Sequence, residues 1–433
     1  MTGWNGPLIL SIVVFGLTYL GILTEKIHRT LVALIGAVAM VCVGTWMHFY
    51  SSDGAIAAVD YNTVILLFGM MVLVALFKET GFFEYVAIKA ARVTGGRPWL
   101  LFLSLGLATT LISMILDNVT TIILMIPVTM SIADILGVSM IPFLIGEVML
   151  SNIGGVATLV GDPPNILIGT AAGFSFMDFL THLAPIVLFV WALAQGILLL
   201  FFRRTLFSVP PNAARLQAMN PKDALTNPRS TWKLLTILGA IVILFFVHDR
   251  IGLESGIVAL IGAVAGLLWL WPDIVPVLKE VHWDVLVFFV GLFVIVGGLE
   301  AAGALDIVAR VMGDFTTHGI ALAALLLLWL AGIMSAVVDN VPFTIAMLPV
   351  LAALSAKGIH TAPLWWALAL GVGFGGNATP VGATSNVIAI SASEKTRCPI
   401  GAKTWMKHGI PIAFGSCALA SLLLFAAIEL HLF

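Results

Sequence analysis

The sequence predicts an all-α polytopic membrane protein built from two inverted repeats. Three observations predict this fold class: an apolar composition, apolar segments of membrane-spanning length, and a long internal repeat. Hydrophobic residues fill 61% of the 433 positions and charged residues only 10%, against roughly 25% charged residues in a soluble domain. The expected surroundings are therefore a lipid bilayer. A formal charge of −2 provides no basic surface for nucleic acid, so no nucleic-acid partner is expected.

Apolar runs of roughly 17 to 25 residues indicate membrane-spanning helices. Two spans, 141–173 and 363–390, are longer and interrupted by polar residues. Two further segments, 99–136 and 317–355, each have a polar break at the middle and are predicted to be re-entrant hairpins. The remaining predicted spans are 7–23, 31–48, 60–77, 179–202, 233–248, 256–271, 284–300 and 408–430. We therefore expect about ten spans, two hairpins and two discontinuous helices.

The basic residues predict the orientation, because short cytoplasmic loops collect Lys and Arg. With the N-terminus outside, all of the 20 basic residues except Arg250, Arg310 and Lys357 fall on the inside. The sequence therefore predicts a multi-pass protein of the inner (cytoplasmic) membrane with both termini outside. The proline-rich, charged linker 203–232 is expected in the cytoplasm between a first repeat, 1–202, and a second, 233–433.

The two halves share matched residues at a nearly constant offset. The octapeptide VALIGAVA occurs at 32–39 and at 258–265, and the tripeptide DNV at 117–119 and at 339–341. Matched polar and glycine residues over such a length indicate an internal duplication. Each half has five spans and one hairpin, and because five is odd, the second copy is inverted. Inverted repeats are typical of secondary transporters, which bind substrate near the midplane.

Four polar breaks interrupt the apolar chain. They read LDNVTT (116–121), VDNVPFT (338–344), SNIGGVATLVGDPPN (151–165) and GFGGNATPVGATSN (373–386). Non-helical chain at membrane depth has to be buried in protein or line a cavity, so we expect one site formed by all four breaks. Two structural alternatives stay open. The paired glycines permit close helix packing, and Asn118, Asn165, Asn340 and Asn386 are suited to capping the half-helices.

Acidic residues at membrane depth usually mark an ion or proton path. Asp117 and Asp339 are repeat equivalents at the hairpin tips, where capping and coupling are both reasonable. Asp162 corresponds to Ala383, and Glu147 also corresponds to an apolar residue, Leu368 or Ala369. This asymmetry favours proton coupling. Because the breaks contain no Lys, Arg or His, the predicted site suits a cation, a proton or a neutral polyhydroxyl solute; a bare anion would need helix N-termini or bound cations.

The four breaks resemble those of the ion transporter superfamily, in the branch of the ArsB arsenite-efflux permeases, the P protein and the NhaD-type sodium/proton antiporters. The resemblance rests on DNVTTIILMIPV, NIGGVATLVGDPPNI, DNVPFTIAMLPV and GGNATPVGATSNV and extends from about residue 8 to about residue 430. It implies two inverted repeats whose tips and breaks form the substrate site. By motif, the implied substrate-binding residues are Asn118, Thr120, Thr121, Gly155, Ala157, Thr158, Asn165, Asn340, Thr344, Asn377, Thr379 and Asn386.

The length of the chain makes it most similar to an arsenite permease. The expected function is export of arsenite or antimonite as the neutral trihydroxide in exchange for protons, with Asp162, Asp117, Asp339 and Glu147 as proton-coupling candidates. One alternative is a sodium/proton antiporter with the cation on the three aspartates, and another is an anion or dicarboxylate transporter or channel. No enzymatic motif, cofactor or metal site is expected, and an ATPase partner subunit stays open.

Overall fold

The regular structure of the protein is entirely helical within the residues that the structure describes. The computed structural model describes residues 5–24, 26–210, 220–394, 396 and 398–432. In this part of the chain, eight helices are long and apolar enough to cross a membrane, and five shorter apolar helices accompany them. The predicted all-α polytopic fold is therefore confirmed. Residues 211–219 of the predicted linker, and parts of both termini, lie outside the described residues.

Helices of the first half occur in the following order. They are α1 (Gly6–Thr24), α2 (Arg29–Trp46), α3 (Ser52–Ala57), α4 (Tyr61–Lys78), α5 (Phe82–Val93), α6 (Pro98–Ser113), α7 (Asn118–Leu136), α8 (Ile141–Gly155), α9 (Pro163–Ala172) and α10 (Phe176–Phe201). The short helix α11 (Arg203–Leu206) and the 3-10 turn η1 (Pro221–Ala224) follow before the second half begins.

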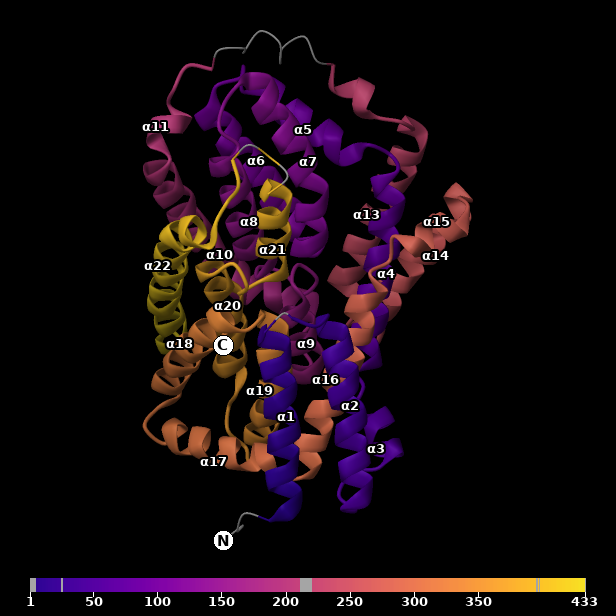
Figure 1. Cartoon of the computed structure of the whole chain (residues 1–433), viewed down its shortest axis with the longest axis vertical. Coiled ribbons are helices and arrows are strands. Elements are labelled where there is room, and N and C mark those ends of the chain that lie inside the picture. Colours follow the sequence, from indigo (N-terminus) through magenta and orange to yellow (C-terminus); the bar gives the residue numbers. More distant parts are fainter. Residues whose placement is uncertain (1–4, 25, 211–219, 395, 397, 433) are drawn as a thin grey trace.

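The second half repeats this order. Its helices are α13 (Pro228–Val247), α14 (Ser255–Leu270), α15 (Ile274–Lys279), α16 (Trp283–Ala301), α17 (Ala304–Thr316), α18 (Ile320–Val337), α19 (Asn340–Ala356), α20 (Ala362–Gly375), α21 (Thr384–Glu394) and α22 (Ala402–Glu429), with the 3-10 turn η2 (Gly376–Ala378) after α20. Helices α6 and α7 occupy the segment predicted as the first hairpin, and α18 and α19 the second. In Figure 1, the α6–α7 pair lies in the upper half of the molecule and the α18–α19 pair in the lower half.

Each broken span ends its first half-helix at a glycine. Helix α8 ends at Gly155, and α9 begins at Pro163, whose missing N–H is no loss in the first turn of a helix. In the other half, α20 ends at Gly375 and α21 begins at Thr384. The chain between the half-helices is therefore not α-helical, and in the second half it contains the 3-10 turn η2.

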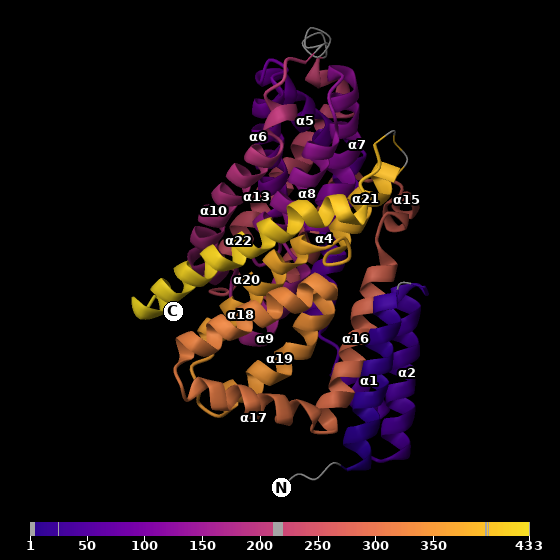
Figure 2. The same ribbon diagram turned by 60° about the vertical axis from the view of Figure 1, so that its left-hand side comes forward.

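The two halves pack into each other rather than side by side. Helix α2 packs against α16 and α4 packs against α14, and both views show α1 and α2 beside α16 (Figures 1 and 2). A Cβ added to Gly69 of α4 would lie 2.7 Å from the carbonyl carbon of Ala259, and one added to Gly291 of α16 would lie 3.1 Å from that of Ala33. These two glycines are repeat equivalents, so the same close helix contact occurs twice.

Two amphipathic helices, α5 and α17, lie between a predicted span and a predicted hairpin, where a loop is expected. Glu84 is in the first turn of α5. This helix buries Phe83, Ala87 and Ala91, which share one helical face, and α17 is its counterpart in the second half. The loop prediction is wrong because a helix of this length is too short to span a membrane and its polar face dilutes the apolar signal. Figure 2 shows α17 running along the lower end of the molecule.

Candidate functional site

Asp162 lies between the two hairpin tips and accepts hydrogen bonds from both. It immediately precedes α9 and is 2% exposed. The side-chain amide of Asn118 donates to Oδ1 at 3.2 Å. The amide of Asn340 donates to Oδ2 at 3.1 Å and to Oδ1 at 3.4 Å. One carboxylate from the first broken span therefore joins a tip of the first half to a tip of the second.

Asn152 of α8 joins the two broken spans in the same way. Its Oδ1 accepts from the amide of Asn118 at 3.2 Å and from the hydroxyl of Ser385 at 2.7 Å. Its Nδ2 donates to the side-chain oxygens of Asn377 at 2.8 Å and Asn386 at 3.0 Å. The side chain is buried, and its four polar contacts reach a hairpin tip and the opposite half-helix. Asn152 thus lies at the centre of the polar network.

A cavity of about 40 Å³ lies beside this network. On the same measure a single water needs roughly 10–15 Å³, so the cavity holds a few water molecules or one small solute. Three carboxylates face it against one guanidinium, so its lining is net negative when the aspartates are ionised. The polar side chains in its wall are Arg29, Asp117, Asn118, Thr120, Asp162, His282, Asp339, Asn340 and Thr384.

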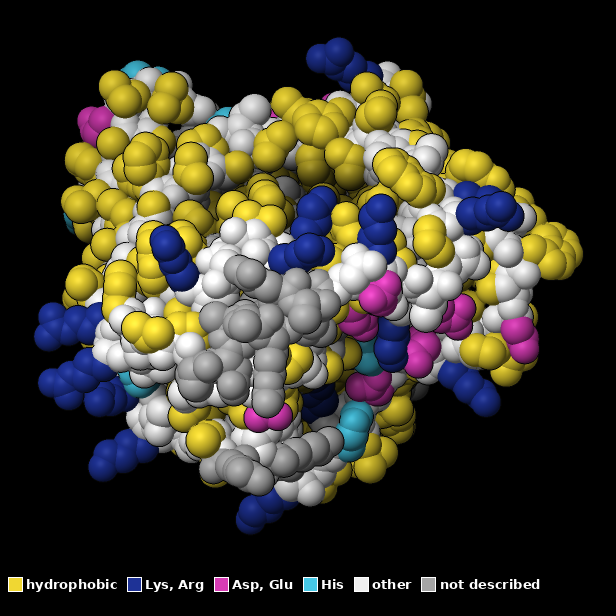
Figure 3. Space-filling view, turned by 90° about the horizontal axis from the view of Figure 1, so that it is seen from above, with side chains coloured by type: hydrophobic (Ala, Val, Ile, Leu, Met, Phe, Trp, Pro, Cys, Tyr) yellow, Lys and Arg dark blue, Asp and Glu magenta, His cyan; other side chains and the backbone are white. Residues whose placement is uncertain are grey.

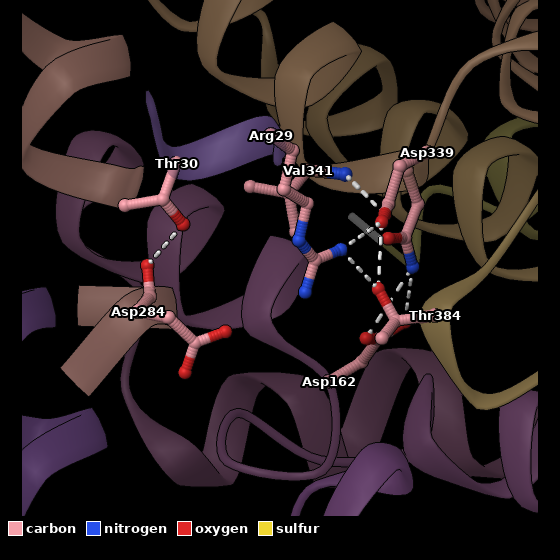
Figure 4. Close-up of polar contacts among 8 residues, drawn as sticks. Arg29, Thr30, Asp162, Asp284, Asp339, Val341 and Thr384 are labelled. Carbon is pink, nitrogen blue, oxygen red and sulfur yellow. Dashed lines mark hydrogen bonds and ion pairs between the residues drawn. The ribbon is translucent and has the colours of Figure 1, made fainter. Parts of the chain in front are cut away.

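Arg29, at the start of α2, contacts the second hairpin tip. Its Nη1 donates to Oδ2 of Asp339 at 3.1 Å and to the hydroxyl of Thr384 at 2.7 Å. The Thr384 hydroxyl in turn donates to the same carboxylate oxygen at 2.7 Å, and Figure 4 shows the three side chains converging. The breaks themselves contain no basic residue, but the inference that the site has none is wrong. The fold brings Arg29 there across 310 sequence positions, and His282 also reaches the cavity wall.

Asn165 and Asn386 hold the broken chain instead of facing the cavity. The amide of Asn165 donates to the carbonyl oxygens of Gly155, Val156 and Thr158 at 2.8–3.1 Å. The amide of Asn386 donates to the carbonyls of its own break, at residues 376 and 379, at 2.7 and 2.8 Å. Unpaired backbone carbonyls are costly at membrane depth, so for these two asparagines the geometry favours the capping alternative.

Other predicted binding residues also belong to the surrounding frame. The hydroxyl of Thr158 donates to the carbonyl of Met114 at 2.5 Å, and that of Thr379 to the carbonyl of Ala336 at 2.5 Å. Both contacts tie a break to the adjacent hairpin. Of the predicted set, Asn118, Thr120 and Asn340 line the cavity. The residues outside its described wall are Thr121, Gly155, Ala157, Thr158, Asn165, Thr344, Asn377, Thr379 and Asn386.

The acidic candidates separate into two places. Asp117, Asp162 and Asp339 line one cavity. Asp117 also caps α7, because its Oδ1 accepts from the backbone N–H of Thr120 at 2.9 Å. Glu147 is buried in α8 away from that wall, and its Oε1 accepts from the hydroxyl of Thr129 at 2.7 Å. The structure therefore groups three of the four proton-coupling candidates and leaves Glu147 apart.

Sequence reasoning missed Asn152 and Arg29 for different reasons. At the offset that pairs Asp162 with Ala383, Asn152 pairs with Gly373. The absence of a matching residue in the second repeat, which singles out Asp162, therefore marks Asn152 as well. No comparable signal marks Arg29, since a basic residue in a short loop is the usual sign of a cytoplasmic face.

Comparison with known proteins supports a transporter. A 36% identical sequence, called a 46 kDa membrane protein, occurs in Mycobacterium leprae, and the match covers 96% of this chain and 98% of that protein. An uncharacterized transporter of Mycobacterium tuberculosis is 35% identical, with 96% of this chain and 97% of that protein covered. The human P protein is 30% identical over 94% of this chain and 58% of its own length.

A solved structure shares the fold of this chain, and a family model matches most of its length. The crystal structure of the Alcanivorax borkumensis YdaH transporter, described as having an unusual topology, matches over 99% of both chains with a TM-score of 0.62 at 14% identity. This likeness shows the fold alone. A family model described as citrate transporter matches residues 19–371. The chain is therefore a membrane transporter that belongs to the citrate transporter (CitMHS) family of the ion transporter superfamily.

Proposed function

We propose that this chain exports a small neutral trihydroxide, arsenite or antimonite, in exchange for protons. The observation that carries the proposal is the small cavity with Asp162 bridging both hairpin tips. A neutral solute with three hydroxyl groups can donate hydrogen bonds to carboxylates and accept them from amides. A bare anion would meet three carboxylates in a poorly hydrated space, where like charges repel strongly.

The hydrogen bonds of Asp162 support proton exchange. An ionised carboxylate is an acceptor only, whereas a protonated one also carries an O–H donor. A proton on Asp162 therefore occupies a carboxylate oxygen that would otherwise accept a hydrogen bond from a hydroxyl group of the solute. Solute and proton then compete for the same groups, which is the requirement for exchange. Asp117 and Asp339 supply the surrounding negative potential, and Glu147 remains a proton-coupling candidate at a separate place.

Transport of a carboxylate such as citrate is the second candidate. Two observations favour it: the description of the family, and the cationic Arg29 with His282 in the cavity wall. Arginine binds carboxylates through paired hydrogen bonds. In the present arrangement, however, Arg29 is bound to Asp339. A carboxylate substrate would have to displace that aspartate or arrive with a cation.

Everted membrane vesicles with a preformed proton gradient distinguish the candidates. If the proposal is right, arsenite or antimonite added to the vesicles dissipates the gradient, and citrate and sodium do not. A response to citrate alone would establish the second candidate, and a response to sodium alone would establish a sodium/proton antiporter. Proteoliposomes of the purified chain test whether transport needs an ATPase subunit. The proposed setting is the inner membrane.

A further inference from the structure

Two polar vestibules occupy equivalent positions in the two inverted repeats. The α2-side vestibule, about 320 Å³, lies at the starts of α2 and α16 and includes His28, Arg29 and Asp284. The α14-side vestibule, about 520 Å³, lies at the starts of α4 and α14. The repeat pairs Arg29 with Ser255 and Asp284 with Asn62. The predicted inversion of the repeats places the two vestibules on opposite sides of the membrane.

Only the α2-side vestibule shares a wall with the central cavity among the residues described. The shared side chains are Arg29, Asp339 and Thr384, which appear in the wall of both spaces. The α14-side vestibule has no described lining residue in common with the cavity. The triad of Arg29, Asp339 and Thr384 therefore lies between the cavity and the α2-side vestibule.

The equivalent position in the α14-side vestibule is uncharged. There the amide of Asn62 donates to the hydroxyl of Ser255 at 3.3 Å, and its Oδ1 accepts from the backbone N–H of Gly256 at 2.7 Å. Among the described lining residues, Lys or Arg thus occurs in the α2-side vestibule but not in the α14-side vestibule. Since Asp339 has a counterpart in Asp117 and Arg29 has none that is charged, Arg29 is the charged member of the triad without a charged counterpart.

We propose that Arg29 is a one-sided gate that also determines which charges pass between the α2-side vestibule and the cavity. A guanidinium at a constriction repels cations, and pores use this barrier for selection. The side chains of Arg29 and Asp339 are 28% and 15% exposed, so water screens the pair and it can separate when a solute arrives. The consequence is that a neutral solute enters from this side while sodium and potassium are kept from the three aspartates.

This inference rests on the proposed binding of solute in the cavity, but its test uses no transported solute. The three cysteines, Cys42, Cys398 and Cys417, are replaced by serine. A reporter thiol is then introduced by Ala383→Cys in the cavity wall or, as a matched position, by Val381→Cys in the vestibule wall. Everted vesicles are treated with neutral and cationic methanethiosulfonates of similar size, and the labelling rates are measured.

Arg29→Ala should increase the labelling of position 383 by the cationic reagent about tenfold, and labelling by the neutral reagent much less. Arg29→Lys should keep the cationic reagent slow, because it preserves the charge. Labelling at position 381 should not change. Lys78→Ala, which removes the exposed Lys78–Glu280 pair, is the matched control and should leave both rates unchanged.

Two results would overturn the gate. Unchanged labelling of position 383 in Arg29→Ala would show that Arg29 does not close this route, and equal increases for both reagents would show that it does not select by charge. Arg29→Ala alone leaves the carboxylate of Asp339 unpaired, which can impair folding. The double variant Arg29→Ala/Asp339→Asn removes that carboxylate as well, so its labelling reports the loss of the gate without this effect on folding. If the labelling results are as expected and arsenite is not transported, the gate stands and the proposed function fails.

Discussion

At the residue scale, matched asparagines hold the frame of each break, whereas two of the charged side chains at the cavity, Asp162 and Arg29, have no charged equivalent in the other repeat. Asn165 and Asn386 are equivalent, and each binds the backbone carbonyls of its own break. Asp162, Asn152 and Arg29 have no equivalent of the same kind. Folding the two halves therefore uses shared residues, and the chemistry that distinguishes the two sides uses the unshared ones.

Replacing Asp162 should abolish the coupling of proton movement to solute transport and leave folding intact. Asp162→Asn keeps the shape and one acceptor oxygen for the tip amides but removes the titrating group. We expect normal yield and a normal elution profile, with loss of arsenite-driven proton movement in everted vesicles. Asp134→Asn, at an exposed aspartate of α7, is the control and should transport normally. Undiminished exchange in Asp162→Asn would remove this residue from the coupling mechanism.

The asparagines should fall into two classes when replaced. Asn165→Ala and Asn386→Ala each leave buried carbonyls unpaired, and one such group costs about 1–3 kcal/mol. Both variants should therefore unfold at a lower temperature in detergent. Asn118→Ala should weaken transport with a smaller thermal effect, since its amide contacts other side chains. Similar melting temperatures for all three variants would contradict this division.

At the element scale, each break is pressed against the hairpin of its own half. A Cβ on Gly161 would lie 2.5 Å from the carbonyl oxygen of Gly155 and 2.7 Å from that of Ser113. On the equivalent Gly382 it would lie 2.5 Å from the oxygen of Gly376 and 2.8 Å from that of Ser335. Hairpin and break therefore form one packed unit in each repeat.

Gly161→Ala and Gly382→Ala should destabilise the protein to a similar degree. Forcing extra volume into a packed site costs about 1–3 kcal/mol, and the nearest atoms here are backbone atoms that cannot rotate away. Thermal unfolding in detergent measures the effect. Gly196→Ala on α10, where an added Cβ meets no atom within 4 Å, should unfold like the native protein. If Gly161→Ala does too, the hairpin and break are not tightly packed.

Sequence reasoning located the hairpins and broken spans because polar residues in an apolar chain are conspicuous. The first hairpin is predicted over residues 99–136, and helices α6 and α7 together cover residues 98–136. Helices α5 and α17 were missed because twelve or thirteen mixed residues fit neither a span nor a polar loop. Arg29 was missed because its contact depends on how α2 packs against α16, which no local pattern contains.

At the scale of the whole molecule, the basic residues gather at one end. Exposed Lys89, Arg92, Arg203 and Arg204 belong to α5 and the start of the linker. In Figure 3, which looks onto this end, Lys and Arg side chains project around the rim and hydrophobic side chains cover much of the flank. This distribution supports the prediction that this end faces the cytoplasm.

A protease site inserted into the linker tests that orientation. We expect cleavage in everted vesicles and protection in right-side-out vesicles, because the positive-inside bias places the linker in the cytoplasm. A cleavable tag at the N-terminus is the internal control and should show the reverse pattern. Cleavage of the linker from the outer face would reverse the orientation and, with it, the side assigned to the Arg29 gate.

In the proposed exchange, the net charge around the cavity also makes transport sensitive to voltage. Three carboxylates face one guanidinium there, and moving one elementary charge through 100 mV of membrane potential changes the free energy by roughly 2.3 kcal/mol. When access to the cavity changes sides, this charge changes its position in the electric field. In the proposed exchange, a proton on Asp162 cancels part of this charge, so the membrane potential acts differently on the protonated and the ionised carrier. The return of the empty carrier would then be an electrical step.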